Sequence, residues 1–366
     1  MKTAIKYTLM GVLALASLQS HAEDFISDGL RYITYGRNGE VQVTKNESAK
    51  GDIEIPSEVT YNGKTYPVIS IGQYAFAYCN DITSITIPNS VRSIKYGAFS
   101  DCPALISVTI PNSVTTIEWS AFSNCSGLTS VTIPNSVTTI DDWMFSNCSG
   151  LTSVTIPNSV TTIKREAFFN CSGITSITIP NSVTTIEREA FSKCSGITSI
   201  TIPNSAPLID QSAFYGCTGL TSVTIPNSVT EIYAFHACTS LKAIYMQCEL
   251  PIPASFYSEI LNEATLYIPI GTLDAYKNSF PWKNFKNIQE MDFSGISGTI
   301  TDNNGTMQIS VNKGTLTIDG IENCGSITIY DMQGRIAYTG TSHTIEHLLP
   351  GLYIVKAGSQ IAKVSI

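Results

Sequence analysis

Ten cysteines are the residues of this chain whose type and spacing most directly suggest chemistry. No histidine or carboxylate shares their period and no C-x-x-C pair is present, so neither a zinc site nor a redox pair is indicated. Stacked repeats would bring neighbouring Cα atoms within bridging distance, but parallel Cβ vectors do not favour disulfides. We therefore expect a buried structural ladder of thiols one period of 23 residues apart, formed by Cys79, Cys102, Cys125, Cys148, Cys171, Cys194 and Cys217. Cys238 follows at a shortened interval, and the state of Cys248 and Cys324 stays open.

A catalytic constellation is missing from the rest of the sequence. Beyond residue 22 the histidines are His236, His343 and His347, and none lies in a zinc-protease motif; G-x-S-x-G and Walker patterns are also absent. The segment 302–305 has the start of a calcium loop but lacks its alternating acids and distal Glu, which favours a hairpin turn. The sequence predicts no catalytic, cofactor or metal site, and hence a protein that is not an enzyme.

Composition narrows the class of partner. Charged residues make up 14% of the chain against roughly 25% in typical soluble domains, and the formal net charge is −8. Nucleic-acid affinity depends on Lys and Arg displacing counterions from phosphates, and the chain has no basic run. We therefore expect that nucleic acid is not the partner, and the macromolecular partner must be sought from the repeats.

The N-terminus has the pattern of a secretory signal peptide. Lys2 and Lys6 precede an apolar stretch over 8–18, and the small-x-small pattern ending at Ala22 predicts cleavage before Glu23. This apolar stretch is too short to span a membrane, which takes about 20 residues. The predicted signal peptide, residues 1–22, indicates export, and no other segment is apolar and long enough to cross a membrane.

A 23-residue repeat organises the middle of the chain. Each unit opens with an Ile, places Phe five residues later and Cys eight residues later, and then alternates apolar and polar residues as a half-buried strand does, until Pro and Asn end it. Such a unit cannot bury its apolar face alone, so copies must stack into a solenoid with short helical or 3₁₀ turns. In one coil the expected inward residues are Ile117, Ala121, Phe122, Cys125, Leu128, Val131, Ile133 and Val137.

These repeats, over about residues 51–290, resemble the leucine-rich repeats of bacterial surface proteins named after BspA. The resemblance rests on L-x-x-V-x-I-P-N-x-V followed by I-x-x-x-A-F-x-x-C. It implies a leucine-rich-repeat solenoid with a parallel β face, and a role in adhesion to host matrix proteins or to other cells. Asn135 follows the strand more closely than the ladder Asn of general leucine-rich repeats does, so it is not equated with that residue.

The two ends of the solenoid differ from the repeat. We expect an N-terminal cap with a degenerate coil over 23–70, the solenoid over 71–248, a C-terminal cap over 249–292, and a small all-β, sandwich-like domain over 293–366. The last domain resembles the sorting domain of the type IX secretion route, which implies display outside a Gram-negative cell and contact with its export machinery. The residues that carry this resemblance are Asp331, Gly334, Gly351, Tyr353 and Lys363. The alternative is an ordinary β-sandwich accessory domain.

Positions two to four residues after each lead Ile vary between units. A repetitive scaffold thus displays a non-repeating stripe in which exposed Trp and Arg, typical interface anchors, recur. The candidate partner-binding residues are Trp119, Asp142, Trp143, Arg165 and Arg188. Neutral drift at unconstrained positions explains the same variation.

The predicted function is an exported adhesin or protein-binding scaffold. One alternative is a glycan-binding accessory protein in which Trp119 and Trp143 stack on sugars, and another is a structural surface-layer component. Columns of strand hydroxyls, such as Ser130 and Thr132, also resemble an ice-binding surface, although Thr is common on exposed strands.

Overall fold

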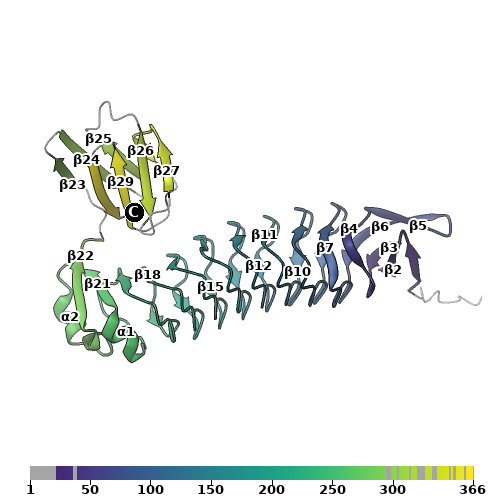
Figure 1. The fold of residues 1–366 in the computed structure, drawn as a ribbon, viewed down its shortest axis with the longest axis horizontal. Helices are drawn as coiled ribbons and strands as arrows, with labels where there is room; N and C mark the ends of the chain where they lie inside the picture. Colours follow the sequence, from purple (N-terminus) through teal and green to yellow (C-terminus); the bar gives the residue numbers. More distant parts are fainter. Residues whose placement is uncertain are drawn as a thin grey trace, which may run out of the picture.

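The structure of the protein is a computed structural model that forms one long solenoid with a separate strand-rich region after it (Figure 1). It describes residues 22–35, 39–293, 298–302, 305–312, 315–319, 326–331, 336–345, 348, 352–357 and 360–365. The predicted signal peptide lies almost wholly outside these residues. Among the described residues no helix is long and apolar enough to cross a membrane.

The N-terminal end is closed by antiparallel strands. β1 (Asp24–Ser27), β2 (Leu30–Tyr35) and β3 (Glu40–Val43) form a meander, and β3 runs parallel to β6 (Lys64–Ile71). β6 also pairs with β5 (Glu58–Tyr61) in a hairpin. Its two turn residues have positive φ, 50° at Asn62 and 74° at Gly63, which suits the right-handed twist of the flanking strands. The region 23–70 thus contains a hairpin beside the first coil.

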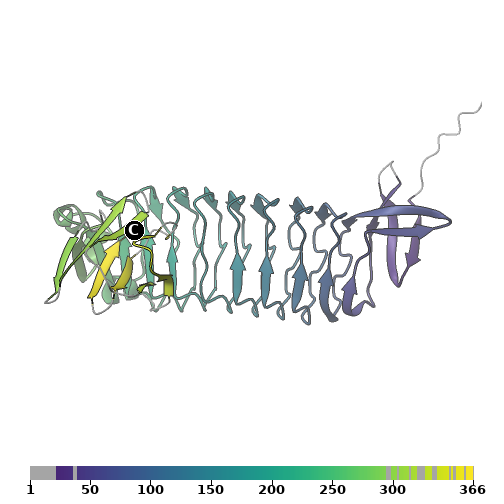
Figure 2. The same ribbon diagram turned by 90° about the horizontal axis from the view of Figure 1, so that it is seen from above.

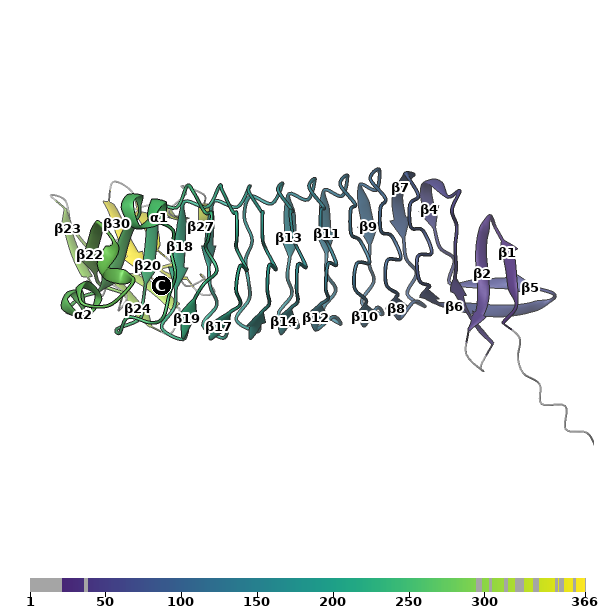
Figure 3. The ribbon, with the colours of Figure 1, turned by 90° about the horizontal axis from the view of Figure 1, so that it is seen from below.

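Most coils of the solenoid contribute two short parallel strands, which form two columns (Figure 3), and the coil 163–185 contributes none to the first column. The first column holds the predicted S-V-T strands: β4 (Lys50–Glu54), β7 (Asp81–Thr86), β9 (Ser107–Thr109), β11 (Ser130–Thr132), β13 (Ser153–Thr155), β16 (Ser199–Thr201), β18 (Ser222–Ile225) and β20 (Ala243–Met246). The second column begins with β6 and continues with two-residue strands that end at the lead Ile: β8 (Ser93–Ile94), β10 (Thr116–Ile117), β12 (Thr139–Ile140), β14 (Thr162–Ile163), β15 (Thr185–Ile186), β17 (Leu208–Ile209) and β19 (Glu231–Ile232). Sequence patterning did not indicate this second column.

Pairing follows the repeat period. Val131 pairs with Val154, and Ile140 pairs with Ile163, in each case 23 residues apart. Equivalent residues therefore lie directly above one another, and the coils stack side by side along the solenoid (Figure 2).

The core is a stack of identical side chains. One Phe from each coil lies against the Phe of the next, with ring centroids 5.2–5.6 Å apart and nearly parallel planes. All eight residues expected to point inward in the coil 117–137 are buried. We call the eight stacked rings the phenylalanine ladder: Phe76, Phe99, Phe122, Phe145, Phe168, Phe191, Phe214 and Phe235.

Turns replace the expected short helices between the two columns. In the coil that opens at Ile117, the N–H groups of Ala121, Ser123 and Cys125 each donate to the carbonyl three residues earlier, as in 3₁₀ structure. Residues with positive φ lie between these bonds, so no continuous helix forms in the described coils 71–248. The 3₁₀ hydrogen bonding was predicted, and the left-handed residues were not.

The C-terminal cap replaces the turns by helices. It contains α1 (Ser258–Glu263), β21 (Thr265–Pro269), α2 (Leu273–Lys277), the 3₁₀ helix η1 (Trp282–Asn284) and β22 (Asn287–Met291). β21 and β22 extend the first strand column beyond β20. Trp282 and Tyr276 are fully buried, and their polar atoms donate to the carbonyls of Ile252 and Cys248, both at 2.7 Å. The cap thus covers the open end of the core with aromatic rings.

The C-terminal region forms two four-stranded sheets. One contains β23 (Gly298–Asp302), β24 (Gly305–Asn312), β25 (Thr315–Asp319) and β28 (Thr344–Ile345); the other contains β26 (Ile327–Asp331), β27 (Ile336–Gly340), β29 (Leu352–Ala357) and β30 (Gln360–Ser365). Both sheets contribute to one core, including Leu316 and Ile318 from the first and Ile329 and Val355 from the second. The region is therefore a β-sandwich with its own hydrophobic core.

The predicted sorting motif falls partly within this sandwich. Asp331 and Tyr353 are register partners on neighbouring strands, Tyr353 is buried, and Lys363 lies in β30. Gly334 and Gly351 lie outside the described residues.

Candidate functional site

The candidate partner-binding residues lie on the turns that follow the second strand column. Trp119 is 42% exposed, Arg165 and Arg188 are exposed, and Asp142 and Trp143 are partly exposed. The turns stack in register, so residues from successive coils that are far apart in sequence become neighbours. The structure therefore brings the predicted residues into one line along the solenoid.

Four aromatic rings form an unbroken row along these turns. Tyr74 meets Tyr96 edge-on with centroids 4.8 Å apart, Tyr96 stacks on Trp119 at 4.9 Å with planes 2° apart, and Trp119 meets Trp143 edge-on at 6.3 Å. We call Tyr74, Tyr96, Trp119 and Trp143 the aromatic stripe. Sequence reasoning identified only the two tryptophans, although both tyrosines occupy the same variable positions after their lead Ile.

Two of the stripe residues have a backbone conformation that is unusual for large side chains. Tyr74 and Trp143 have φ of 51° and 52°, in the left-handed region that bulky residues avoid. This conformation directs their N–H groups to the next coil, where they donate to the carbonyls of Tyr96 at 3.2 Å and Arg165 at 3.0 Å. A left-handed non-glycine residue costs on the order of 1–3 kcal/mol, so the fold holds these rings outward against a local preference.

Gly97 makes room for the first ring of the stripe. It occupies the left-handed position one coil after Tyr74, with φ 58°. A Cβ built on Gly97 would overlap the Tyr74 ring, with its nearest atom 2.4 Å away. Any other residue at position 97 would push Tyr74 off Tyr96, so the Tyr74–Tyr96 contact depends on this glycine.

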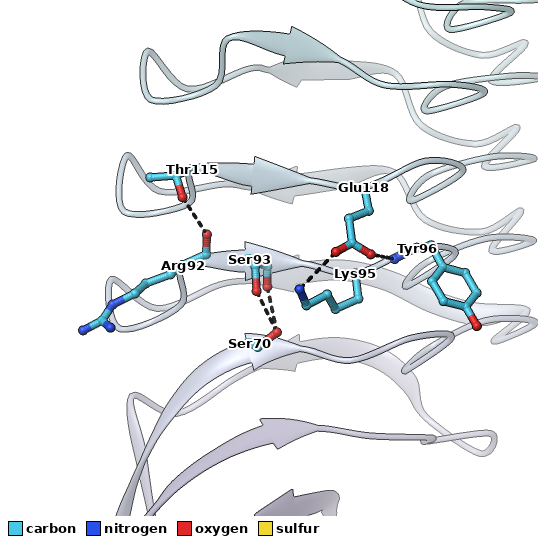
Figure 4. Close-up of polar contacts among 7 residues, drawn as sticks. All are labelled: Ser70, Arg92, Ser93, Lys95, Tyr96, Thr115 and Glu118. Carbon is cyan, nitrogen blue, oxygen red and sulfur yellow. Dashed lines mark hydrogen bonds and ion pairs between the residues drawn. The ribbon is translucent and has the colours of Figure 1, made fainter. Parts of the chain in front are cut away.

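Glu118, from the next coil, fixes the turn that carries Tyr96 (Figure 4). One carboxylate oxygen pairs with the Lys95 ammonium at 3.0 Å, and the other accepts the backbone N–H of Tyr96 at 3.0 Å. A charge-assisted hydrogen bond to the backbone fixes the turn that carries the Tyr96 ring. Tyr96 and Trp119 are thereby pre-positioned without a partner.

Arginine continues the line beyond the aromatic stripe. The Arg165 guanidinium lies 5.1 Å from the centroid of the Trp143 ring and pairs with Glu166 at 3.0 Å. In the next coil Arg188 pairs with Glu189 at 2.9 Å. Asp142 takes part in no ion pair with any described residue. Beyond the stripe, each arginine therefore pairs with the glutamate that follows it in sequence. The partly exposed carboxylate of Asp142 has no such partner among the described residues.

The periodic thiols are buried beneath these turns. Cys79, Cys102, Cys125, Cys148, Cys171, Cys194, Cys217 and Cys238 are free, and each thiol donates to a backbone carbonyl of a preceding turn, in most coils that of a ladder Phe, as Cys148 does to Phe122 at 3.1 Å. Burial raises the pKa of Cys148 to about 12, so its reactive thiolate is not populated near neutrality. Cys248 is also free and buried, and burial raises its pKa to about 11; Cys324 lies outside the described residues.

An amide ladder runs beside the thiols, and sequence reasoning missed it. The side-chain amide of Asn124 donates to Asp101, that of Asn147 to Asn124, and that of Asn170 to Asn147, at 2.9–3.0 Å. These four residues are left-handed, which Asn and Asp tolerate better than other non-glycine residues. The recurring S-N-C triplet was its signal, whereas Asn135, after the strand, is exposed.

Few other side chains among the described residues could form a metal or catalytic site. No cluster of three metal-ligating side chains occurs in the part of the chain that the structure describes. His236 contacts the Ser255 hydroxyl at 3.2 Å and stacks on Tyr257. The strand hydroxyls of Ser130 and Thr132 are exposed, as expected.

Comparison with known protein families identifies the family to which the solenoid belongs. The family model described as "BspA type Leucine rich repeat region" matches residues 52–175 and 164–286, which together exceed half of the chain. The chain belongs to this BspA-type leucine-rich-repeat family. The predicted resemblance is confirmed for the solenoid, whereas the likeness of the C-terminal sandwich to a sorting domain remains a proposal. No curated protein matches the chain.

The chain is also similar to several solved structures. A leucine-rich repeat protein from Bacteroides ovatus is 26% identical over 67% of this chain and 78% of its own, with a TM-score of 0.42. A leucine rich cell surface protein from Faecalibacterium prausnitzii is 23% identical over 74% and 95%, with a TM-score of 0.36. The pneumococcal vaccine antigen PcpA is 16% identical over 74% and 98%, with a TM-score of 0.33.

Proposed function

We propose that this BspA-type protein is a non-enzymatic scaffold that binds a protein partner through the aromatic stripe. The observation that supports this is the row of four contacting, solvent-accessible rings on a turn whose other features repeat from coil to coil. Tyr and Trp are enriched at the energetic centres of protein interfaces because they bury large areas at low entropic cost. The left-handed backbone at Tyr74 and Trp143 recurs at the equivalent position of other coils, such as Glu189, so the repeated turn of the scaffold sets the direction of these two rings.

Rigidity of the scaffold supports the same role. The stripe is fixed by backbone bonds between coils and by the Glu118 carboxylate, so little ordering is needed on binding. A preorganised surface loses less free energy to conformational entropy when a partner docks. Modest contacts spread over several coils are then sufficient for specific binding.

We further propose that the protein acts outside the cell as an adhesin. Support comes from the signal-like N-terminus, the family membership, and the β-sandwich whose sequence resembles a type IX sorting domain. Its partner would be a host matrix or cell-surface protein. Deletion of residues 293–366 should retain the protein inside the cell envelope of the Gram-negative bacterium that produces it. Unchanged surface display would contradict the sorting role.

The binding role can be tested by crosslinking at the stripe. A photo-crosslinking residue at exposed Gln73 leaves all four rings intact and should capture the partner from host matrix or bacterial surface fractions. Binding of the purified partner should then weaken at least about 10-fold in Trp119→Ala/Trp143→Ala. The matched control is Tyr215→Ala, an exposed aromatic residue on a later coil outside the stripe. Equal affinity of wild type and the double variant would overturn the proposal.

Sugar stacking on the two tryptophans is not favoured by the ring geometry. One face of Trp119 is covered by Tyr96 at 4.9 Å, and one face of Trp143 by the Arg165 guanidinium. A sugar could stack only on the remaining face of each ring, so the stripe offers less area for sugar stacking than two isolated tryptophans would. This arrangement suits a protein segment that can wedge between rings.

A further inference from the structure

We propose that the aromatic stripe recognises a proline-rich segment of the partner in the polyproline II conformation, with a basic residue near its prolines. This inference rests on the proposed protein-binding function and specifies its partner chemistry. It follows from three features of the stripe: the spacing of its perpendicular ring pairs, its unpaired hydrogen-bond donors and its charge.

The ring pairs have the spacing of a polyproline II turn. Tyr74 with Tyr96 and Trp119 with Trp143 form two edge-on pairs, at 84° and 67°, separated by the stacked pair in the middle. The two pairs are two coils apart, which is about 10 Å at the usual spacing of parallel strands. Residues three apart in a polyproline II helix repeat every roughly 9.3 Å. Two prolines three positions apart would therefore reach both pairs when the segment runs along the solenoid.

Edge-on pairs suit proline better than a flat surface does. In such a pair one ring presents its edge, so its own faces are not covered by that neighbour. A proline ring can pack in the angle between the two planes. Aromatic-lined surfaces of this kind recognise polyproline II segments, whose preformed conformation lowers the entropy lost on binding.

The polar atoms of the stripe match the backbone of such a segment. The hydroxyls of Tyr74 and Tyr96 and the indole N–H groups of Trp119 and Trp143 make no hydrogen bond to any described residue. Carbonyl groups of a polyproline II helix have no internal hydrogen bonds and need donors. Four unpaired donors along one line supply these partners.

The charge near the stripe selects a basic residue. Lys95 and Glu118 neutralise each other, as do Asp141 and Lys164, and Arg165 pairs with Glu166. The Lys164 ammonium that pairs with Asp141 also attracts Asp142, which lies directly before Trp143 and forms no close ion pair of its own among the described residues. The chain as a whole carries a formal net charge of −8, which attracts basic segments over longer range. An arginine or lysine beside the second proline would pair with Asp142.

Synthetic peptides test this inference on the chain from residue 23 to 366. The first peptide has two prolines three positions apart followed by an arginine; the second has them four apart; the third replaces the arginine by glutamate. Cellohexaose serves as the oligosaccharide probe. Tryptophan fluorescence is a direct readout because two of the three tryptophans lie in the stripe and Trp282 is buried. Calorimetry gives the dissociation constants.

We expect the first peptide to bind at least about 10-fold more tightly than the second and third, and the double variant Trp119→Ala/Trp143→Ala to lose this binding. Asp142→Asn should weaken the first peptide about 3- to 10-fold and reduce the salt dependence of its affinity, because the net negative charge of the chain still attracts the peptide. The control Tyr215→Ala should bind like wild type. Equal binding of the first two peptides, or stripe-dependent binding of cellohexaose alone, would overturn the inference.

The same variants separate this inference from the proposed function. If no peptide binds but the double variant still loses the crosslinked protein partner, the proline-rich inference is wrong and the stripe remains a protein-binding site. If the partner also binds the double variant normally, both are wrong.

Discussion

The phenylalanine ladder and the aromatic stripe are both stacks of rings with one contribution per coil, yet they differ in every other respect. The ladder uses the same residue in all eight coils, is fully buried and keeps nearly parallel planes. The stripe uses different residues, is accessible and alternates between stacked and perpendicular contacts. Repetition therefore accompanies stability here, and departure from the repeat accompanies the proposed recognition.

Left-handed residues sharpen this difference. At the amide ladder the left-handed position is occupied by Asn or Asp, which lowers its cost, and neighbouring amides bond to one another. At the stripe the other left-handed position holds Tyr74 and Trp143, which gain no side-chain hydrogen bond within the described residues. The amide ladder therefore lowers the free-energy cost of a left-handed backbone, whereas Tyr74 and Trp143 adopt this backbone at its full cost.

The largest expected effect is alkaline unfolding of the interior. Burial raises the pKa of Cys148, Cys194 and Cys238 to about 12, above the ordinary value of 9.0. The unfolded chain releases these protons first, so stability is full below about pH 9 and falls between pH 9 and 12, by up to about 1.4 kcal/mol per pH unit for each thiol. Thermal melts from pH 7 to 10 should show this decline. The triple variant Cys125→Ala/Cys148→Ala/Cys171→Ala should have a shallower slope; an equal slope would contradict the role of the thiols.

Removing one ring of the phenylalanine ladder should cost about 3–5 kcal/mol, because Phe145→Ala leaves a cavity between two stacked rings. In a repeat protein the loss is felt mainly by neighbouring coils. Hydrogen exchange should therefore accelerate most between residues 122 and 168. Trp119→Ala, a matched loss from the stripe, should cost less than about 1 kcal/mol. Similar costs for the two variants would erase the distinction between ladder and stripe.

A smaller effect is expected from the amide ladder. Asn147→Ala removes the two hydrogen bonds of the amide ladder and a longer one to Ser146, and it places Ala at φ 60°, which together should cost about 1–2 kcal/mol in denaturant unfolding. Asn135→Ala is the matched control, since Asn135 is exposed, and should change stability by less than about 0.5 kcal/mol. A larger effect at Asn135 would mean that the ladder has been assigned to the wrong asparagine.

The smallest expected effect has the opposite sign. Glu189→Gly relieves a left-handed residue at φ 58° while giving up an exposed ion pair with Arg188, and should stabilise the chain by about 0.5 kcal/mol. Trp143→Gly at the equivalent position relieves the same strain but should abolish partner binding. Unchanged melting of Glu189→Gly would show that this backbone position is not strained.

Most of the fold could be predicted from the repeat period. Spacing alone placed Ile117, Phe122 and Cys125 inside, because equivalent residues of stacked coils must share one environment. It did not indicate the two-residue strands such as Thr139–Ile140, which are too short to show alternation. It also did not show the left-handed residues between the 3₁₀ hydrogen bonds, since positions such as Trp143 and Glu166 are occupied by types that seldom adopt positive φ.

The stripe was predicted only in part. Variation after the lead Ile singled out Trp119 and Trp143, but Tyr74 and Tyr96 differ by one position within their units. Whether rings one position apart can touch depends on the left-handed backbone at Tyr74 and on the missing Cβ of Gly97. Both are properties of the folded turn, so spacing alone does not predict the contact between Tyr74 and Tyr96, whereas Tyr96 and Trp119, one period apart, could have been connected by the repeat.

The central claim is that the interior ladders provide stability while the aromatic stripe provides binding. The most direct test measures both quantities on Trp119→Ala/Trp143→Ala: the free energy of unfolding, and the affinity for the partner crosslinked at Gln73. The account predicts a change in unfolding free energy below about 2 kcal/mol together with at least about a 10-fold loss of affinity. A folded double variant that binds the partner as tightly as wild type would contradict it.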